Sequence, residues 1–166
     1  MQDAFFQCGF ESILIPSSVE KIDKRCFAFC ESLKSIEFDK NSKLTSFGSY
    51  MLTRTKIEEI KIPSSIKKIE EGVFDDMKFL KSIEFDENSK LYIIGGNVFF
   101  CSSLENLSMP LSVKQINGCS FNKANKLKNI FISNENKSFL YYENKILLYK
   151  SNENENFDEI IFARKD

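Results

Sequence analysis

One short pattern recurs six times along this chain of 166 residues, and it limits the folds that the chain can adopt. Each copy spans six residues, and its first, fourth and sixth residues are apolar. Consecutive copies are 23 or 24 residues apart in alternation, because the central apolar residues are Ile13, Ile36, Ile60, Ile83, Leu107 and Ile130. This period predicts a solenoid, in which each coil buries its apolar side chains by stacking on its neighbours.

Two kinds of repeat alternate along the chain. One kind continues with Pro-Ser-Ser at residues 16–18 and 63–65, and with the variant Pro-Leu-Ser at residues 110–112. The other kind continues with Asp-Lys-Asn-Ser-Lys-Leu at residues 39–44 and Asp-Glu-Asn-Ser-Lys-Leu at residues 86–91. The array therefore repeats as a two-coil unit of 47 residues.

Each copy of the pattern predicts one short strand. Apolar and polar residues alternate in Ile36-Glu37-Phe38, which is typical of a strand with one face turned inward. Strands of the same phase in successive coils must be parallel, so we expect a single parallel β-sheet on the concave side. We expect irregular, 3₁₀ or short helical segments on the convex side, around residues 27–30 and their equivalents. The residues expected to point inward are Ile36, Ile60, Ile83, Leu107 and Ile130.

A known family shares these motifs. Residues 15–22, Ile-Pro-Ser-Ser-Val-Glu-Lys-Ile, followed by Phe27, Cys30, Leu33 and Ile36, closely resemble the BspA-like leucine-rich repeat. The resemblance covers about residues 3–133. It implies a leucine-rich-repeat solenoid of about six repeats in residues 1–133. The apolar runs of the tail are similar to the β cap that closes the array in relatives, which implies a C-terminal β cap in residues 134–166.

The resemblance also implies a function. Members of the family are surface-exposed or secreted proteins that act in adhesion or bind host proteins, and the family has no catalytic residues to carry over. A cell-surface or extracellular location is therefore expected by resemblance, and a cytoplasmic one stays open. Arg54 and Met77 stand where the family usually has cysteine.

Composition excludes several classes of function. The chain has no histidine, which removes Ser–His and Cys–His nucleophilic pairs and histidine metal sites. Its net charge of −1 argues against nucleic-acid binding, which needs concentrated positive charge. No run of 18 apolar residues is present, so we expect no membrane insertion, and residues 1–6 do not resemble a signal peptide. The sequence predicts a protein that is not an enzyme and uses no cofactor or metal.

The chain has five cysteines. Cys8, Cys30 and Cys101 align with Met77 and Ala124, and a position that accepts these three residue types is typical of a small core site. We therefore expect mostly buried, reduced thiols. A disulfide between Cys8 and Cys30 in adjacent coils is the alternative.

The candidate binding site consists of the outward positions of the predicted strands, which stacking aligns into two columns. Acid, base, amide and hydroxyl groups are mixed there, as suits specific hydrogen bonding. Phe131 is the aromatic member and the best candidate for an anchor residue. The full set is Ser35, Glu37, Glu59, Lys61, Ser82, Glu84, Asn106, Ser108, Asn129 and Phe131.

A third column beside these two alternates in charge, and two interpretations remain open for it. It either favours the stacking register of the coils or forms part of the binding surface. Its members are Glu11, Lys34, Glu58, Lys81, Glu105 and Lys128.

The leading hypothesis is a binding module that presents its sheet to a protein or glycan partner. The alternative is a structural protein that self-associates through its N-terminal end, where residues 3–6 begin in mid-repeat. If the sheet is not the site, the convex side and the polar run at residues 152–156 are the next candidates. Asn106 and Asn136 begin triplets that match the glycosylation acceptor pattern.

Overall fold

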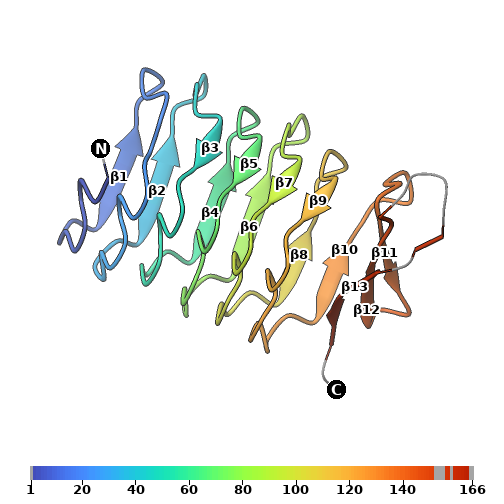
Figure 1. Ribbon diagram of the computed structural model, residues 1–166. Coiled ribbons are helices and arrows are strands. Elements are labelled where there is room, and N and C mark those ends of the chain that lie inside the picture. The colour runs from blue at the N-terminus through green and yellow to red at the C-terminus, as the bar shows by residue number, and fades with distance from the viewer. Residues whose placement is uncertain (1, 152–155, 158, 165–166) are drawn as a thin grey trace.

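The computed structural model describes residues 2–151, 156–157 and 159–164 and shows a solenoid whose coils stack along one axis (Figure 1). The solenoid fold expected from the repeats is confirmed. One strand of each coil faces the same side, and we call these strands the front row. The front row consists of β1 (Ser12–Ile15), β2 (Ser35–Phe38), β4 (Glu59–Ile62), β6 (Ser82–Phe85), β8 (Asn106–Ser108) and β10 (Asn129–Phe131).

The predicted register of the front row is confirmed. The five central apolar residues from Ile36 to Ile130 are all buried in one continuous core. Their neighbours in the sequence, such as Glu37 and Glu59, are exposed. The alternation therefore places every second side chain of the front row on an outer face of the solenoid.

The front row is hydrogen-bonded in pairs and not as one continuous sheet. β1 pairs with β2, β4 with β6, and β8 with β10, in each case in parallel. These are the strands that stand 23 residues apart. No hydrogen-bonded ladder joins β2 to β4 or β6 to β8, the strands that stand 24 residues apart, in the part of the chain that the structure describes. The extra residue thus interrupts the row once in every two-coil unit.

A second parallel sheet, which the repeat pattern did not predict, lies on the return arm of the coils. We call it the return row, and it consists of β3 (Ser46–Phe47), β5 (Lys68–Ile69), β7 (Ile93–Ile94) and β9 (Gln115–Ile116). Each of these strands has one buried residue and stacks one coil from the next, so its backbone groups meet those of its neighbours. The front row and the return row enclose the core (Figure 1).

The remaining arc of each coil is irregular, and none of the described residues is helical. Each arc contains two positions four residues apart with positive φ, such as Arg25 and Phe29 or Tyr50 and Arg54, with φ between 52° and 64°. Backbone hydrogen bonds join these arcs from coil to coil. The Phe27 N–H, for example, donates to the Met51 carbonyl at 3.1 Å. Of the alternatives expected for this side, the structure adopts the irregular one.

The cysteine alignment made from the sequence is wrong at two positions. Arg54 and Cys101 both have positive φ, as Phe29 does, and therefore lie one residue before the core position that Cys30 occupies. Thr55 and Ser102 fill that position instead, and both are buried with side-chain hydroxyls that lack a hydrogen-bond partner among the described residues. The arcs differ by one residue in length, so counting along the sequence shifted the alignment.

Arg54 has a different role from the one that the alignment assigned to it. Its guanidinium lies 5.2 Å from the centre of the Phe29 ring in the preceding coil. It also forms an ion pair of 2.8 Å with Asp76 in the following coil. The residue therefore connects three coils on the outside of the arc and fills no core position.

All five cysteines are free thiols in the structure. Cys26 and Cys30 are buried, and burial raises the pKa of both thiols. Cys8 and Cys101 are half-buried and Cys119 is exposed, so the expectation of mostly buried thiols is confirmed only for Cys26 and Cys30. Cys119 lies at one of the positive-φ positions of its arc, where the side chain points away from the core.

We predict that one thiol of the native protein reacts fast with a thiol-specific reagent and that this thiol is Cys119. Cys26 and Cys30 should react slowest, because they are buried and a raised pKa leaves less of the reactive thiolate. The Cys119→Ser variant should lose the fast phase, and the denatured protein should show five reactive thiols. A fast phase that survives in Cys119→Ser would contradict the assignment.

The C-terminal segment forms an antiparallel sheet of β11 (Phe139–Tyr142), β12 (Ile146–Tyr149) and β13 (Glu159–Ala163). It packs against the last coil through Phe162, whose ring centre lies 5.3 Å from that of Phe121. The placement of this sheet agrees with a cap, and the boundary between residues 1–133 and 134–166 stays a prediction.

Asn136 joins the last coil to the C-terminal sheet. The sequence had marked this residue as the start of a glycosylation acceptor triplet. Its side-chain amide donates to the carbonyl oxygens of Leu111 and Val113, at 3.4 and 3.3 Å. Its Oδ1 accepts the backbone N–H groups of Ser138 and Phe139. Asn136 is buried by these contacts, so it does not offer its amide as a glycosylation acceptor.

Candidate binding face

The structure places all ten predicted site residues on the front row, and all point out of the core. Eight are exposed, and Ser35 and Asn129 are half-buried. Phe131, the predicted anchor, is 57% exposed on β10. The ten residues therefore lie on one side of the solenoid and are accessible to a partner, and their role in binding stays a prediction. The run at residues 152–156 lies almost wholly outside the described residues.

Side chains on this face bond only within the strand pairs. The ion pairs of the charged column are Glu11 with Lys34, Glu58 with Lys81, and Glu105 with Lys128. Asn129 donates to Asn106 at 2.8 Å in the same way. In the described residues no ion pair or side-chain hydrogen bond joins β2 to β4 or β6 to β8. The charged column therefore strengthens the register of each strand pair and does not run continuously along the solenoid.

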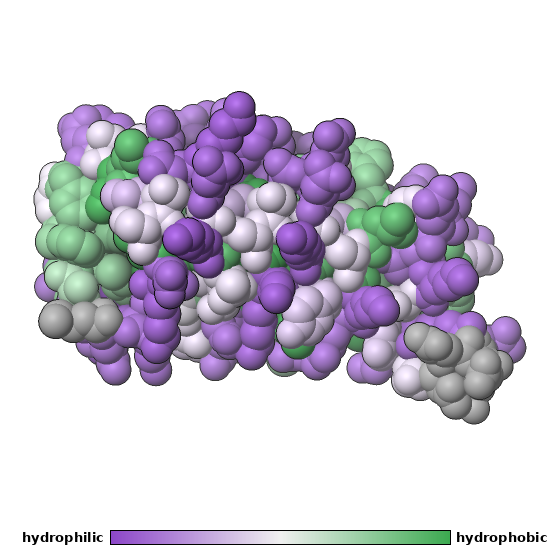
Figure 2. All heavy atoms as spheres, turned by 90° about the horizontal axis from the view of Figure 1, so that it is seen from above, coloured by the Kyte–Doolittle hydropathy of each residue, from purple (hydrophilic) through white to green (hydrophobic). Residues whose placement is uncertain are grey.

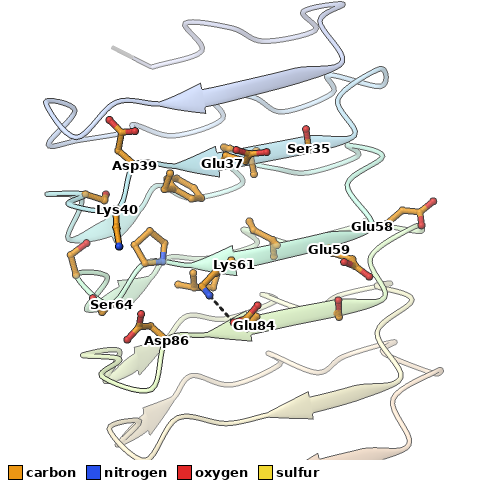
Figure 3. Close-up of a pocket in the computed structure, with 18 of the residues that line it drawn as sticks. Ser35, Glu37, Asp39, Lys40, Glu58, Glu59, Lys61, Ser64, Glu84 and Asp86 are labelled. Carbon is orange, nitrogen blue, oxygen red and sulfur yellow. Dashed lines mark hydrogen bonds and ion pairs between the residues drawn. The ribbon is translucent and has the colours of Figure 1, made fainter.

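The interruption between β2 and β4 is an open groove of about 970 Å³ (Figure 3). Ile36, Phe38, Ile60 and Ile62 contribute apolar lining, and Pro63 lies at the end of β4. The six predicted site residues of β2, β4 and β6 all line the groove: Ser35, Glu37, Glu59, Lys61, Ser82 and Glu84. We call this cavity the β2–β4 groove.

A proline limits the ladder at the groove. The turn from the front row to the return row takes 11 residues in the coil of β2 (Ile36 to Phe47) and 9 in the coil of β4 (Ile60 to Ile69). The same difference separates β1 from β2, which are hydrogen-bonded, so turn length alone does not account for the groove. Pro63 follows β4 directly and has no N–H, so it cannot extend a ladder toward β2.

The interruption of the front row decides which carboxylate forms an ion pair with Lys61. Its equivalents in the two adjacent coils are both carboxylates, Glu37 on β2 and Glu84 on β6. It forms an ion pair of 2.8 Å with Glu84, across the hydrogen-bonded strand pair. This bond raises the pKa of Lys61. Glu37, across the groove, has no ion-pair partner among the residues that the structure describes.

A second, smaller groove of about 400 Å³ lies between β6 and β8, one two-coil unit further along. Ser82, Glu84 and Ser108 line it, together with Pro110, the equivalent of Pro63. Asn106, Asn129 and Phe131 line neither groove. The structure thus divides the predicted site into two grooves and a flatter region at β10.

Sequence reasoning missed the residues at and just beyond the carboxyl ends of β2 and β4. Phe38, Asp39, Lys40 and Pro63 line the β2–β4 groove and were not among the predicted site residues. The alternation of 23- and 24-residue steps in the sequence could have indicated them. Strands that stand 24 residues apart are not hydrogen-bonded to each other, and the groove forms between them.

Neither a metal site nor a membrane span appears in the described part of the chain. No group of three or more His, Cys, Asp and Glu side chains there has a geometry that could hold a metal ion. No helix long and apolar enough to cross a bilayer occurs among the same residues.

Comparison with known families agrees with the repeat and the fold. The family model described as the BspA type leucine rich repeat region, with six copies, matches residues 1–128 and 88–162. The chain belongs to the BspA type leucine-rich repeat family. No curated protein matches it.

Solved structures of bacterial repeat proteins are similar to this BspA type chain. The crystal structure of the pneumococcal vaccine antigen PcpA is 34% identical, with a TM-score of 0.79, and the match covers 84% of this chain and 34% of PcpA. A leucine rich cell surface protein from Faecalibacterium prausnitzii A2-165 is 19% identical, with a TM-score of 0.61, over 84% of this chain and 42% of that one.

A leucine-rich repeat protein from T. pallidum is 26% identical, with a TM-score of 0.50, over 78% of this chain and 49% of its own. The chain therefore spans between about a third and a half of these three proteins. The resemblance to the F. prausnitzii protein concerns the fold alone.

Proposed function

We propose that this chain is a non-enzymatic binding module that holds a protein or glycan partner on its front row and acts at the cell surface as an adhesin. The observation that carries the proposal is the β2–β4 groove. It combines apolar lining residues with polar groups that have no partner among the described residues, on a row held in place by coil-to-coil hydrogen bonds. Such a site can bind specifically without first having to order itself.

Two further observations support the proposal. The chain has no histidine, and the groove has no nucleophile paired with a base among the described residues, so its side chains suit binding better than catalysis. The similar proteins include a pneumococcal vaccine antigen, which is consistent with a location at the cell surface.

A charge exchange on the front row tests the proposal. Lys61→Glu combined with Glu84→Lys retains the ion pair, so the melting temperature should stay nearly unchanged. The charges that a partner meets are reversed, so binding to an immobilised glycan array or to a panel of extracellular-matrix proteins should weaken about tenfold.

The matched control is the same exchange on the return row, Lys68→Glu with Glu70→Lys, whose ion pair spans 3.0 Å. This variant should bind as the native protein does. Binding that survives both the front-row exchange and Phe131→Ala would show that the front row is not the site.

Self-association is a second candidate function. Phe5 and Leu14 of the first coil are 42% and 56% exposed, and hydrophobic side chains gather at that end of the solenoid, at the left in Figure 2. Light scattering that grows with protein concentration and is abolished by Phe5→Ser would favour this function.

A further inference from the structure

Two carboxylates of the β2–β4 groove form no ion pair among the described residues. Glu37 projects from β2 and Glu59 from β4 (Figure 3), and both side chains are exposed. Neither takes part in an ion pair or a side-chain hydrogen bond within the described residues. Lys61 is the cation that could have neutralised Glu37, but it bonds to Glu84.

The other charges of the groove leave its middle acidic. Lys34, at the start of β2, is paired with Glu11 of the preceding coil. Two lysines of the groove form no ion pair within the described residues, namely Lys40, which follows β2, and Lys56, which precedes β4. Because strands β2 and β4 are parallel, these two lysines belong to opposite ends of the groove. The uncompensated negative charge thus lies on the strands between them.

The backbone of β2 also has unpaired groups at the groove. The Ser35 N–H donates to the Glu11 carbonyl, so the backbone groups of Ser35 and Glu37 face β1. Since successive residues of a strand face opposite neighbours, the N–H and C=O groups of Ile36 and Phe38 face β4. None of them is hydrogen-bonded to β4, both strands being described in full.

The edge of β4 is unpaired in the same way. The Ser82 N–H donates to the Glu58 carbonyl, so alternation turns the backbone groups of Glu59 and Lys61 toward β2. The next residue whose backbone faces β2 is Pro63, which has no N–H to donate. Both edges of the groove therefore carry backbone donors and acceptors that no strand of the described chain satisfies and that a peptide lying along the groove could use.

The β6–β8 groove has the same backbone arrangement without the same charge. Glu84, the equivalent of Glu37, is neutralised by Lys61. Asn106 stands in place of Glu59, and its side-chain oxygen accepts a hydrogen bond from Asn129. The smaller groove is therefore an internal control, in which neither of the corresponding positions is an unpaired carboxylate.

We propose that the β2–β4 groove binds an extended basic segment of a protein partner, with Glu37 and Glu59 pairing with its guanidinium or ammonium groups. A carboxylate accepts charge-assisted hydrogen bonds from a guanidinium, and the two carboxylates stand at different points along the groove, so they suit a segment with more than one basic side chain. The unpaired backbone groups favour a peptide over a glycan. This proposal rests on the proposed function and names the chemistry of the partner for that same site.

The test uses the full chain, labelled with ¹⁵N, and a capped octapeptide of alternating threonine and arginine. The peptide should shift the amide signals of Ile36, Phe38, Glu59 and Lys61 in a saturable manner, and shift those of Phe85 and Ser108 in the smaller groove much less. A peptide with citrulline in place of arginine keeps the shape and loses the charge, and it should bind at least about tenfold more weakly.

Two double variants complete the experiment. Glu37→Gln with Glu59→Gln should weaken the arginine peptide at least about tenfold, with the melting temperature nearly unchanged because neither side chain has a partner to lose. Glu20→Gln with Glu87→Gln removes the same total charge from other exposed positions and should bind like the native protein.

The outcomes separate this proposal from the proposed function. No saturable shift at millimolar peptide, equal binding of the citrulline peptide, or equal shifts in both grooves would overturn the basic-peptide proposal. If a glycan from the array shifts the amides of the β2–β4 groove instead, the front row is still a binding face and only the partner chemistry is wrong. If every array and panel interaction survives both the Lys61 and Glu84 exchange and Phe131→Ala, the proposed function fails by itself.

Discussion

Replacing Phe99 with alanine should destabilise the protein by about 3–5 kcal/mol. The side chain is fully buried, and its ring lies between those of Phe74, with centres 6.0 Å apart, and Phe121, 5.2 Å apart. These rings belong to three successive coils, so the cavity left by the substitution would lie where each coil depends on its neighbours for burial. Chemical denaturation followed by circular dichroism measures the free energy of unfolding.

Phe79→Ala is the matched control, since it removes the same side chain from a position that is 47% exposed. Its effect should stay within about 0.5 kcal/mol, as for most surface substitutions. Equal losses from Phe99→Ala and Phe79→Ala would contradict the stacked core.

The second large loss of stability is expected from Gly95→Ala, which overcrowds the contact between two coils instead of leaving a cavity. A Cβ at residue 95 would lie 2.7 Å from the carbonyl carbon of Glu70 and 2.8 Å from the backbone nitrogen of Glu71. These are main-chain atoms of the preceding coil, and they cannot rotate away as a side chain can. The two coils would have to separate where the return row is hydrogen-bonded, so we expect a loss of about 3 kcal/mol, at the upper end of typical overpacking costs.

Gly118→Ala provides the comparison in the next coil. A Cβ there would meet nothing within 4 Å, so the clash is absent and only the backbone preference changes. The melting temperatures of the two variants should therefore differ clearly. A Gly95→Ala variant as stable as Gly118→Ala would show that the coils do not approach each other so closely.

The repeat period made the architecture predictable, because burial requires each apolar pattern to occupy the same place in every coil. The inward positions from Ile36 to Ile130 follow from the alternation of apolar and polar residues, since a strand register wrong by one residue would expose the whole set. The lack of histidine is likewise a property of the sequence alone, and it removes the commonest catalytic and metal-binding arrangements whatever the fold.

Alignment by counting was less reliable in the arcs, where no alternation marks the register. Arg54 and Cys101 were placed one residue away from their true positions, because arcs of unequal length were matched residue by residue. The positive φ angles of these residues resolve the register, and backbone angles of this kind are not visible in the sequence. The return row was missed for a related reason, since two-residue strands are too short to show a period.

The sequence by itself determined the coil, its parallel stacking and the ten outward positions, because these depend on which residues must avoid water. The tertiary structure decided how those positions are used. Lys61 has a carboxylate one coil away on either side, and only the distance between strands selects Glu84 over Glu37. Pro63 lacks the N–H that would extend a ladder from β4 toward β2, and the separation of the two strands forms only when the coils stack, so the groove and its unpaired charges exist only in the folded chain.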